Sequence, residues 1–314
     1  MTLAPYVRIV AQGKGRARSL TLDEADAAMS VILSGDAAQE AVGALLMVLR
    51  LRGETDAEIA GFTRASRRSA QNTLPPADLD WPCYAAGRTR GAPLFLLAAR
   101  LVANAGYRVS LHGRNSHQGT AANLPTAIEA LNIEGAGLSY MPLETLSQRA
   151  FDLLALRDTF GLRSCINTVL RMWNPSGAPA SVQGVFHPSY RGLQSRAAAL
   201  LGDRNLTVIK GGGGEFERNP AKDTALFGLR DGADLDATAP ALFDASRRLH
   251  EPDRPVDLRA LWAGRVLSPF AEDTITGTAA VALWTMNDAP TLAQCEMRAR
   301  ALWHQRLEPE RRTA

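Results

Sequence analysis

From Trp81 onward, short apolar runs bounded by glycine alternate with amphipathic segments, and this alternation constrains the fold more than any other feature. The runs are short enough to be buried strands, and the segments between them have helical periodicity. The expected strands are 81–86, 107–111, 181–186 and 206–209, and the expected helices are 93–105 and 190–200. Repeated strand–helix units of this kind predict a parallel sheet flanked by helices.

The first 74 residues have a different, helical pattern. Residues 21–24 (Thr-Leu-Asp-Glu) form a capping box ahead of one helix, and residues 55–58 (Thr-Asp-Ala-Glu) form another. Apolar residues recur at helical spacing over 42–49, between the two boxes. The prolines at 75–76 end this pattern, and a helical pattern returns over residues 143–172.

These patterns together predict an α/β protein. We expect a small N-terminal helical domain packed on a larger α/β domain with a central, mostly parallel sheet. The helical domain is expected to span 1–74, joined by helices from about 143–172, and the α/β domain to take 79–142 and 173–314. A third capping box at 291–294 predicts a closing helix.

The composition fits a globular protein that folds without metal or disulfide bonds. Apolar residues make up 46% of the chain and charged residues 21%. The cysteines Cys83, Cys165 and Cys295 have no zinc-like spacing, so a structural metal is not expected. No apolar stretch has the length of a membrane span, and the longest, at 93–102, contains Arg100. We therefore expect a cytoplasmic protein that does not bind membranes.

The positive charge of the chain is carried almost entirely by arginine. Of the 35 basic residues, only Lys14, Lys210 and Lys222 are lysines. Guanidinium groups bind phosphate with two parallel hydrogen bonds and stack on bases, although a biased genome composition gives the same arginine excess. The net charge of +3 is too small to decide between these explanations.

Three glycine-containing loops follow expected strands of the α/β domain. They span residues 87–91, 112–117 and 210–215, and each contains at least one basic side chain. Ligands of parallel sheets bind at the carboxyl ends of the strands, so these loops are candidates for holding an anion. None has the spacing of a P-loop or of a dinucleotide-binding loop, which argues against ATP and NAD as ligands.

The order of these segments resembles the anthranilate phosphoribosyltransferase family, also called glycosyltransferase family three. The most specific part runs from Arg157 to Pro175, which is similar to the family's Arg, Leu-Gly-x-Arg, Asn and Asn-Pro pattern. The His-Gly-Arg-Asn loop at 112–115 and the Val-Gln-Gly-Val segment at 182–185 add to the likeness. The resemblance implies a helical domain packed on an α/β domain, and a homodimer formed through the helical domain.

Two segments depart from the family pattern. The family binds phosphoribosyl pyrophosphate with a Gly-Thr-Gly-Gly-Asp loop, where this chain has Ala-Gly-Arg-Thr-Arg-Gly at 86–91. The family's adjacent Asp-Glu pair for magnesium is replaced by Glu215 and Glu217, which Phe216 separates. These departures favour a protein whose catalytic apparatus is eroded.

The first functional hypothesis is a nucleic-acid-binding protein built on this fold. The chain resembles a non-tryptophan branch of the family through residues 13–18, 49–54 and 214–220. This hypothesis predicts DNA or RNA as partner with little sequence preference, no cofactor, and residues 14–18 in a loop with no acid nearby. The expected phosphate-binding residues are Lys14, Arg16, Arg18, Arg88, Arg90, Arg114, Arg157, Arg163, Arg171 and Lys210.

The alternative is an active transferase that uses phosphoribosyl pyrophosphate and magnesium. The resemblance then implies Glu215 and Glu217 as magnesium ligands, Arg163 as the residue that holds an acidic acceptor, and Asn167 as a supporting residue. His112 either contacts a ligand phosphate or bonds a backbone carbonyl. Arg157 and Arg163 could instead pair with neighbouring aspartates, which is the ordinary structural role of such residues.

Overall fold

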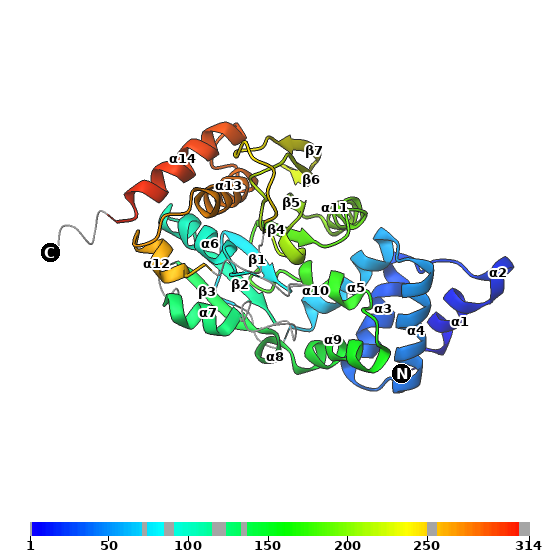
Figure 1. Cartoon of the computed structure of the whole chain (residues 1–314). Coiled ribbons are helices and arrows are strands. Elements are labelled where there is room, and N and C mark those ends of the chain that lie inside the picture. Colours follow the sequence, from blue (N-terminus) through cyan, green and yellow to red (C-terminus); the bar gives the residue numbers. More distant parts are fainter. Residues whose placement is uncertain are drawn as a thin grey trace.

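The structure, a computed structural model, describes residues 2–70, 74–84, 91–114, 124–132, 137–249 and 256–307, without the side chain of Lys14. A helical part and an α/β part lie side by side in the ribbon view (Figure 1). The expected fold class is confirmed. Within the described ranges, no helix has both the length and the apolar character that crossing a membrane requires.

The helical part is built by the N-terminal helices and by a later return of the chain. Both expected capping boxes are present: Thr21 and Thr55 each accept a hydrogen bond from the amide three residues ahead, and the glutamate there bonds back. The helices are α1 (Ala4–Ala11), α2 (Gly13–Arg16), α3 (Leu22–Ser34), α4 (Gln39–Arg52), α5 (Asp56–Arg68), α8 (Leu143–Leu146), α9 (Gln148–Phe160) and α10 (Ile166–Arg171).

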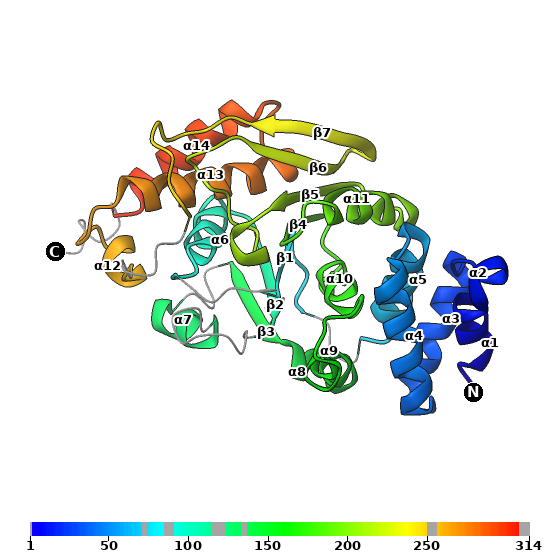
Figure 2. The same ribbon diagram turned by 45° about the vertical axis from the view of Figure 1, so that its right-hand side comes forward.

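The helices α3 and α5 approach each other unusually closely at Gly61. A Cβ atom at this position would lie 2.3 Å from the carbonyl oxygen of Leu22, so only glycine allows the contact. The helix α10 contacts both α5 and the strand β1 (Leu79–Cys83), and it lies between the helical part and the sheet in both ribbon views (Figure 1, Figure 2).

The sheet has seven strands in the order β3-β2-β1-β4-β5-β6-β7. The first five strands run parallel, whereas β6 and β7 form an antiparallel hairpin at the edge. The remaining strands are β2 (Val109–Gly113), β3 (Leu138–Pro142), β4 (Ala180–Val185), β5 (Asn205–Lys210), β6 (Thr224–Arg230) and β7 (Ala233–Ala239). The mostly parallel sheet was expected from the sequence, but β3 and the hairpin were not.

Two hydrophobic cores lie on opposite faces of the sheet. One contains side chains of the helical part and of α11, and it reaches Leu206 and Val208 of β5. The other face of β5 presents Thr207, which accepts a hydrogen bond from Thr285 at 2.6 Å. The helices of the α/β part are α6 (Phe95–Asn104), α7 (Leu124–Leu131), α11 (Tyr190–Leu201), α12 (Leu258–Trp262), α13 (Pro269–Thr285) and α14 (Leu292–Gln305).

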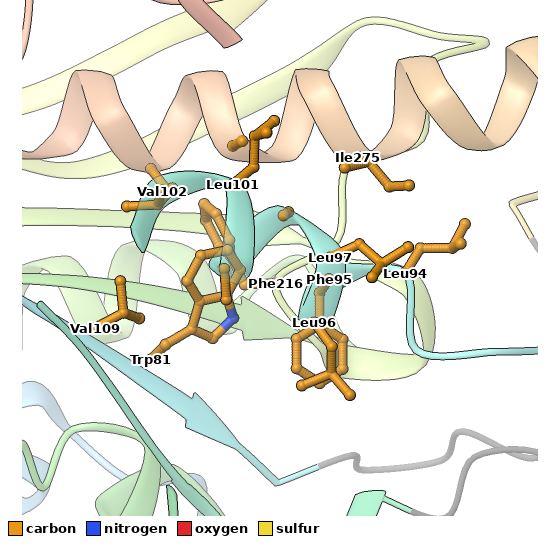
Figure 3. Close-up of a cluster of buried hydrophobic side chains, with 14 of the residues drawn as sticks. Trp81, Leu94, Phe95, Leu96, Leu97, Leu101, Val102, Val109, Phe216 and Ile275 are labelled. Carbon is orange, nitrogen blue, oxygen red and sulfur yellow. The ribbon is translucent and has the colours of Figure 1, made fainter. Parts of the chain in front are cut away.

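An aromatic cluster fixes the segment after β5 against α6 and β1. The ring of Trp81 on β1 stacks on Phe95 and meets the edge of Phe216 at 5.3 Å between ring centroids. Figure 3 shows Phe95 and Phe216 from separate segments meeting at Trp81. Phe216 is fully buried, so the glutamates on either side of it are held close to the core.

Candidate functional site

A cavity of about 560 Å³ lies between the helical part and the carboxyl end of β4. Four arginines from different segments line it, together with Asn167 and a rim that includes Leu162, Phe186, His187 and Tyr190. We call this cavity the arginine pocket. Its arginines are Arg50, Arg157, Arg163 and Arg171.

The turn between α9 and α10 places the central arginine. The helix α9 ends at Gly161, which has the left-handed backbone conformation (φ 66°) that caps helices. The chain then runs through Arg163 before α10 starts at Ile166. The resemblance implied Arg163 and Asn167 as a pair of site residues, and the structure places both on the same cavity.

The Arg163 side chain is half-buried next to other positive charges. Burial and the neighbouring guanidinium groups of Arg157 and Arg50 together lower the pKa of Arg163. Among the described residues, Arg163 forms no ion pair. Arg157 forms an ion pair with Asp158, with 3.5 Å between Nε and Oδ1. An anion in the pocket would therefore relieve repulsion among these arginines, in addition to forming hydrogen bonds with them.

Arg171 forms part of the wall of the pocket. Its side chain is buried, and its two terminal nitrogens donate to the carbonyl oxygens of Asn167 at 3.0 Å and Tyr84 at 2.6 Å. Burial lowers the pKa of Arg171, an effect that the negative charge of Glu215 opposes. The guanidinium thus joins α10 to the end of β1, and it interacts electrostatically with both Glu215 and Arg163.

His112 is fully buried at the end of β2, away from solvent. Its Nε2 atom lies 3.1 Å from Oδ1 of Asp80, and its Nδ1 atom lies 3.0 Å from the hydroxyl of Tyr84. Asp80 also accepts a hydrogen bond from Ser181 at 3.1 Å. Both ring nitrogens thus face side chains. The two roles considered from sequence, contact with a ligand phosphate or a bond to a backbone carbonyl, do not match this arrangement.

Glu215 and Glu217 are both buried in the segment that follows β5. Oε2 of Glu217 accepts a hydrogen bond from the backbone amide of Phe95 at 2.9 Å, at the first turn of α6. Among the described residues, no three histidine, cysteine or acidic side chains gather as a metal cluster. Magnesium needs only one or two protein carboxylates when phosphate oxygens complete its coordination shell. The carboxylate oxygens of Glu215 and Glu217 are therefore suitable ligands for this ion.

The remaining expected residues that the structure describes are dispersed. Arg18, expected to have no acid nearby, forms an ion pair with Glu24 at 2.6 Å. The first part of the loop expected at 14–18 belongs to the helix α2, which ends at Arg16. Arg16 is exposed on α2. Arg114 lies over the ring of Phe151 at 4.1 Å, and Lys210 lines a different cavity. Arg88, Arg90 and the side chain of Lys14 lie outside the described residues.

The sequence did not identify the aromatic rim or Arg50 as parts of one site. Tyr190 and Arg50 are 140 positions apart in the chain, and they meet only because α4 and α11 converge on the pocket. The hydroxyl of Tyr190 also donates to Glu54 at 3.3 Å. The nearest sequence signal for Arg50 was the arginine-rich segment at 49–54, which contains it.

Comparisons with known proteins agree with this arrangement. Residues 5–70 match the model described as "Glycosyl transferase family, helical bundle domain". An anthranilate phosphoribosyltransferase of Bacillus caldotenax is 31% identical over 233 residues, which cover 69% of this chain and 95% of the relative. The chain belongs to the anthranilate phosphoribosyltransferase family.

Other members of the anthranilate phosphoribosyltransferase family match most of the chain. The enzyme of Geobacillus kaustophilus is 29% identical over 302 residues, with 88% of each chain covered. The crystal structure of the Thermus thermophilus protein superposes with a TM-score of 0.74 at 23% identity, over 93% of this chain and 95% of that one. The Saccharomyces cerevisiae enzyme in complex with PRPP and Mg gives a TM-score of 0.72 at 16% identity, over 97% and 94%.

The expectation of a DNA or RNA partner is wrong. The relatives are named anthranilate phosphoribosyltransferase, and a structural neighbour is a complex with PRPP and Mg. The structure gives a physical reason, because those arginines chosen from sequence that lie within the described residues do not form one surface. Arg18 is paired, Arg171 is buried, and Arg163 faces a cavity of small-molecule size. The expected absence of a cofactor also lacks support, since that neighbour contains Mg.

Proposed function

We propose that this chain is a transferase that moves a phosphoribosyl group from phosphoribosyl pyrophosphate to an acidic acceptor in the arginine pocket. The observation that carries the proposal is Arg163, half-buried at a cavity that it shares with three further arginines. A carboxylate provides the planar pair of acceptor oxygens that a guanidinium binds best.

The shape and lining of the pocket favour a small aromatic acid as the acceptor. Leu162, Phe186 and Tyr190 provide apolar surface beside the arginines, and the volume of about 560 Å³ lies within the range of small-molecule sites. Anthranilate, for which the relatives are named, combines a carboxylate with an aromatic amine. It is therefore the first acceptor to test.

The donor half of the reaction would use the segment after β5. Glu215 and Glu217 would hold magnesium, which neutralises the charge of the departing pyrophosphate when it is bound. Glu217 already accepts one hydrogen bond from Phe95, and a carboxylate has about four lone-pair positions, so this bond does not use up its capacity.

Ligand-induced stabilisation tests the proposal. Phosphoribosyl pyrophosphate with magnesium should raise the melting temperature of the protein, because a ligand that binds only the folded state stabilises it. Anthranilate should add to this shift in the wild type but not in Arg163→Ala. Arg8→Ala removes an exposed arginine of α1 and serves as the control. No shift at millimolar phosphoribosyl pyrophosphate would contradict the proposal.

The homodimer expected through the helical part stays a prediction. Light scattering on the purified protein measures the mass in solution and tests it directly.

A further inference from the structure

The lining of the arginine pocket has more positive charge than a single carboxylate neutralises. Its described residues include four arginines and one acid, Asp158. Asp158 forms an ion pair with Arg157. Arg171 is buried, and its terminal nitrogens donate to two backbone carbonyl oxygens. The guanidinium groups of Arg50 and Arg163 are therefore the two that an anionic ligand can use most freely.

Arg50 lies in the last turn of α4, where its side chain is exposed. Within the part of the chain that the structure describes, it forms no ion pair. Arg52 in the same turn is instead paired with the buried carboxylate of Glu58 and donates to the hydroxyl of Ser19 at 2.9 Å. The helix dipole favours a basic residue at both positions, but it does not require a guanidinium that lines a cavity.

Glu54 interacts with Arg50 but compensates its charge only in part. Oε2 of Glu54 accepts a hydrogen bond from the Tyr190 hydroxyl at 3.3 Å, and Oε1 is buried with no hydrogen-bond partner among the described residues. Burial raises the pKa of Glu54 in spite of the positive charge of Arg50. The carboxyl therefore resists ionisation, and it is not a full counter-ion for this arginine.

Arg50 and Arg163 come from different segments of the chain and affect each other through charge. Arg163 lies in the turn between α9 and α10, whereas Arg50 belongs to α4. The charge of Arg50 contributes to the lowered pKa of Arg163, after the effects of burial and of Arg157. A ligand with a negative group for each of the two arginines would relieve this repulsion more fully than a ligand with one.

Apolar side chains beside the arginines provide a surface for a ring. Leu162 and Phe186 are 55% and 45% exposed, although both are large and apolar. Exposed apolar groups at a concave surface are typical of ligand-binding sites. The volume of about 560 Å³ also leaves space for a further substituent on a benzoate ring.

We propose that the acceptor bound in the arginine pocket is an aromatic amine with two carboxylates, one held by Arg163 and the other by Arg50. This inference rests on the proposed function, since it takes the pocket to be the acceptor site. Arg50 is then a specificity-determining residue, which favours a diacid over an acceptor with a single carboxylate such as anthranilate.

Calorimetric titration with two matched ligands tests the role of Arg50. The first ligand, 2-aminoterephthalate, is anthranilate with a second carboxylate across the ring. The second is its methyl ester at that carboxylate, which has a similar shape without the second charge. We expect the wild type to bind the diacid at least about fivefold more tightly than the ester, which is the upper end for a solvent-exposed ion pair.

Three variants show whether this preference comes from Arg50. The ratio of the two affinities should fall close to one in Arg50→Ala and should be kept in part by Arg50→Lys, which retains the charge. The control Arg8→Ala removes an exposed arginine of α1 outside the pocket and should keep the wild-type ratio. The ratio is compared within each variant, so a general change in affinity does not affect it.

The outcomes distinguish this inference from the proposed function. A ratio near one in the wild type, an unchanged ratio in Arg50→Ala, or no binding of either ligand overturns the inference. Failure of the transferase proposal is measured separately, as the absence of pyrophosphate release with anthranilate. A preference that depends on Arg50 without such release supports the diacid site and contradicts only the transfer reaction.

Discussion

The carboxylate of Glu217 accepts a hydrogen bond from the backbone amide of Phe95, with 2.9 Å between oxygen and nitrogen. The first amides of a helix have no partner within the helix, and its amino end carries partial positive charge. Glu217 therefore connects the loop after β5 to α6 and compensates that charge with a group of the protein itself.

Replacement of Glu217 should separate this structural role from a role in metal binding. Glu217→Ala leaves a buried amide without its acceptor, so we expect a loss of about 1–3 kcal/mol in the free energy of unfolding. Glu217→Gln keeps an acceptor oxygen and should lose less, while it removes the charge that magnesium needs. Urea denaturation of both variants measures the difference. Unchanged stability in Glu217→Ala would contradict the assigned contact.

Substitution of Arg171 should destabilise the protein far more than substitution of Arg163. Arg171→Ala removes a buried group that bonds two carbonyl oxygens, so we expect a loss of about 2–4 kcal/mol in stability. Arg163→Ala should change stability by no more than about 0.5 kcal/mol, because it removes a partly exposed charge that its neighbours repel. Thermal and urea unfolding of the two variants compares them. A larger loss of stability in Arg163→Ala than in Arg171→Ala would contradict the roles given to the two residues.

Gly211 should not tolerate alanine. A Cβ atom there would lie 1.5 Å from the carbonyl oxygen of Glu215, so the glycine loop would have to move. Such overpacking costs about 1–3 kcal/mol or more. Gly15→Ala is the matched control, since a Cβ atom there meets no other atom within 4 Å. Equal melting temperatures for the two variants would show that the loop is not packed as described.

The pH dependence of stability should include a contribution from Glu54. Burial raises the pKa of Glu54 above its ordinary value of 4.5 in spite of the nearby Arg50. Between the two pKa values the folded state binds this proton more strongly than the unfolded state, so stability falls as pH rises through that range.

Substitution of Glu54 by glutamine should remove this contribution. Glu54→Gln keeps an acceptor for the Tyr190 hydroxyl and has no charge to bury. The stability of the variant relative to the wild type should therefore increase as the pH is raised above 4.5. Urea denaturation at a series of pH values measures it. A difference that is constant with pH would contradict the raised pKa.

Sequence patterns predicted the elements whose causes are local. The capping boxes at Thr21, Thr55 and Thr291 form as expected, because each depends on four consecutive residues. The β6–β7 hairpin had a local signal that we did not use. Asp231 and Gly232 both take positive φ values, 53° and 85°, as a two-residue hairpin turn requires.

The site was predictable only in part, because its parts come from distant segments. The segment from Arg157 to Pro175 contains Arg163, Asn167 and Arg171 close together, and these line one cavity. The environment of His112 depends on Asp80 and Tyr84, which belong to the neighbouring strand and its end. No sequence spacing indicates such pairs, since strand order and register determine them.

The most direct test of the transferase account is the release of pyrophosphate. The purified protein is incubated with phosphoribosyl pyrophosphate, magnesium and anthranilate, and the pyrophosphate formed is measured with time. The account predicts release that depends on all three components and falls at least about tenfold in Arg163→Ala, as expected for the loss of one charge-assisted contact. No release above the enzyme-free rate, or equal release by the variant, would contradict it.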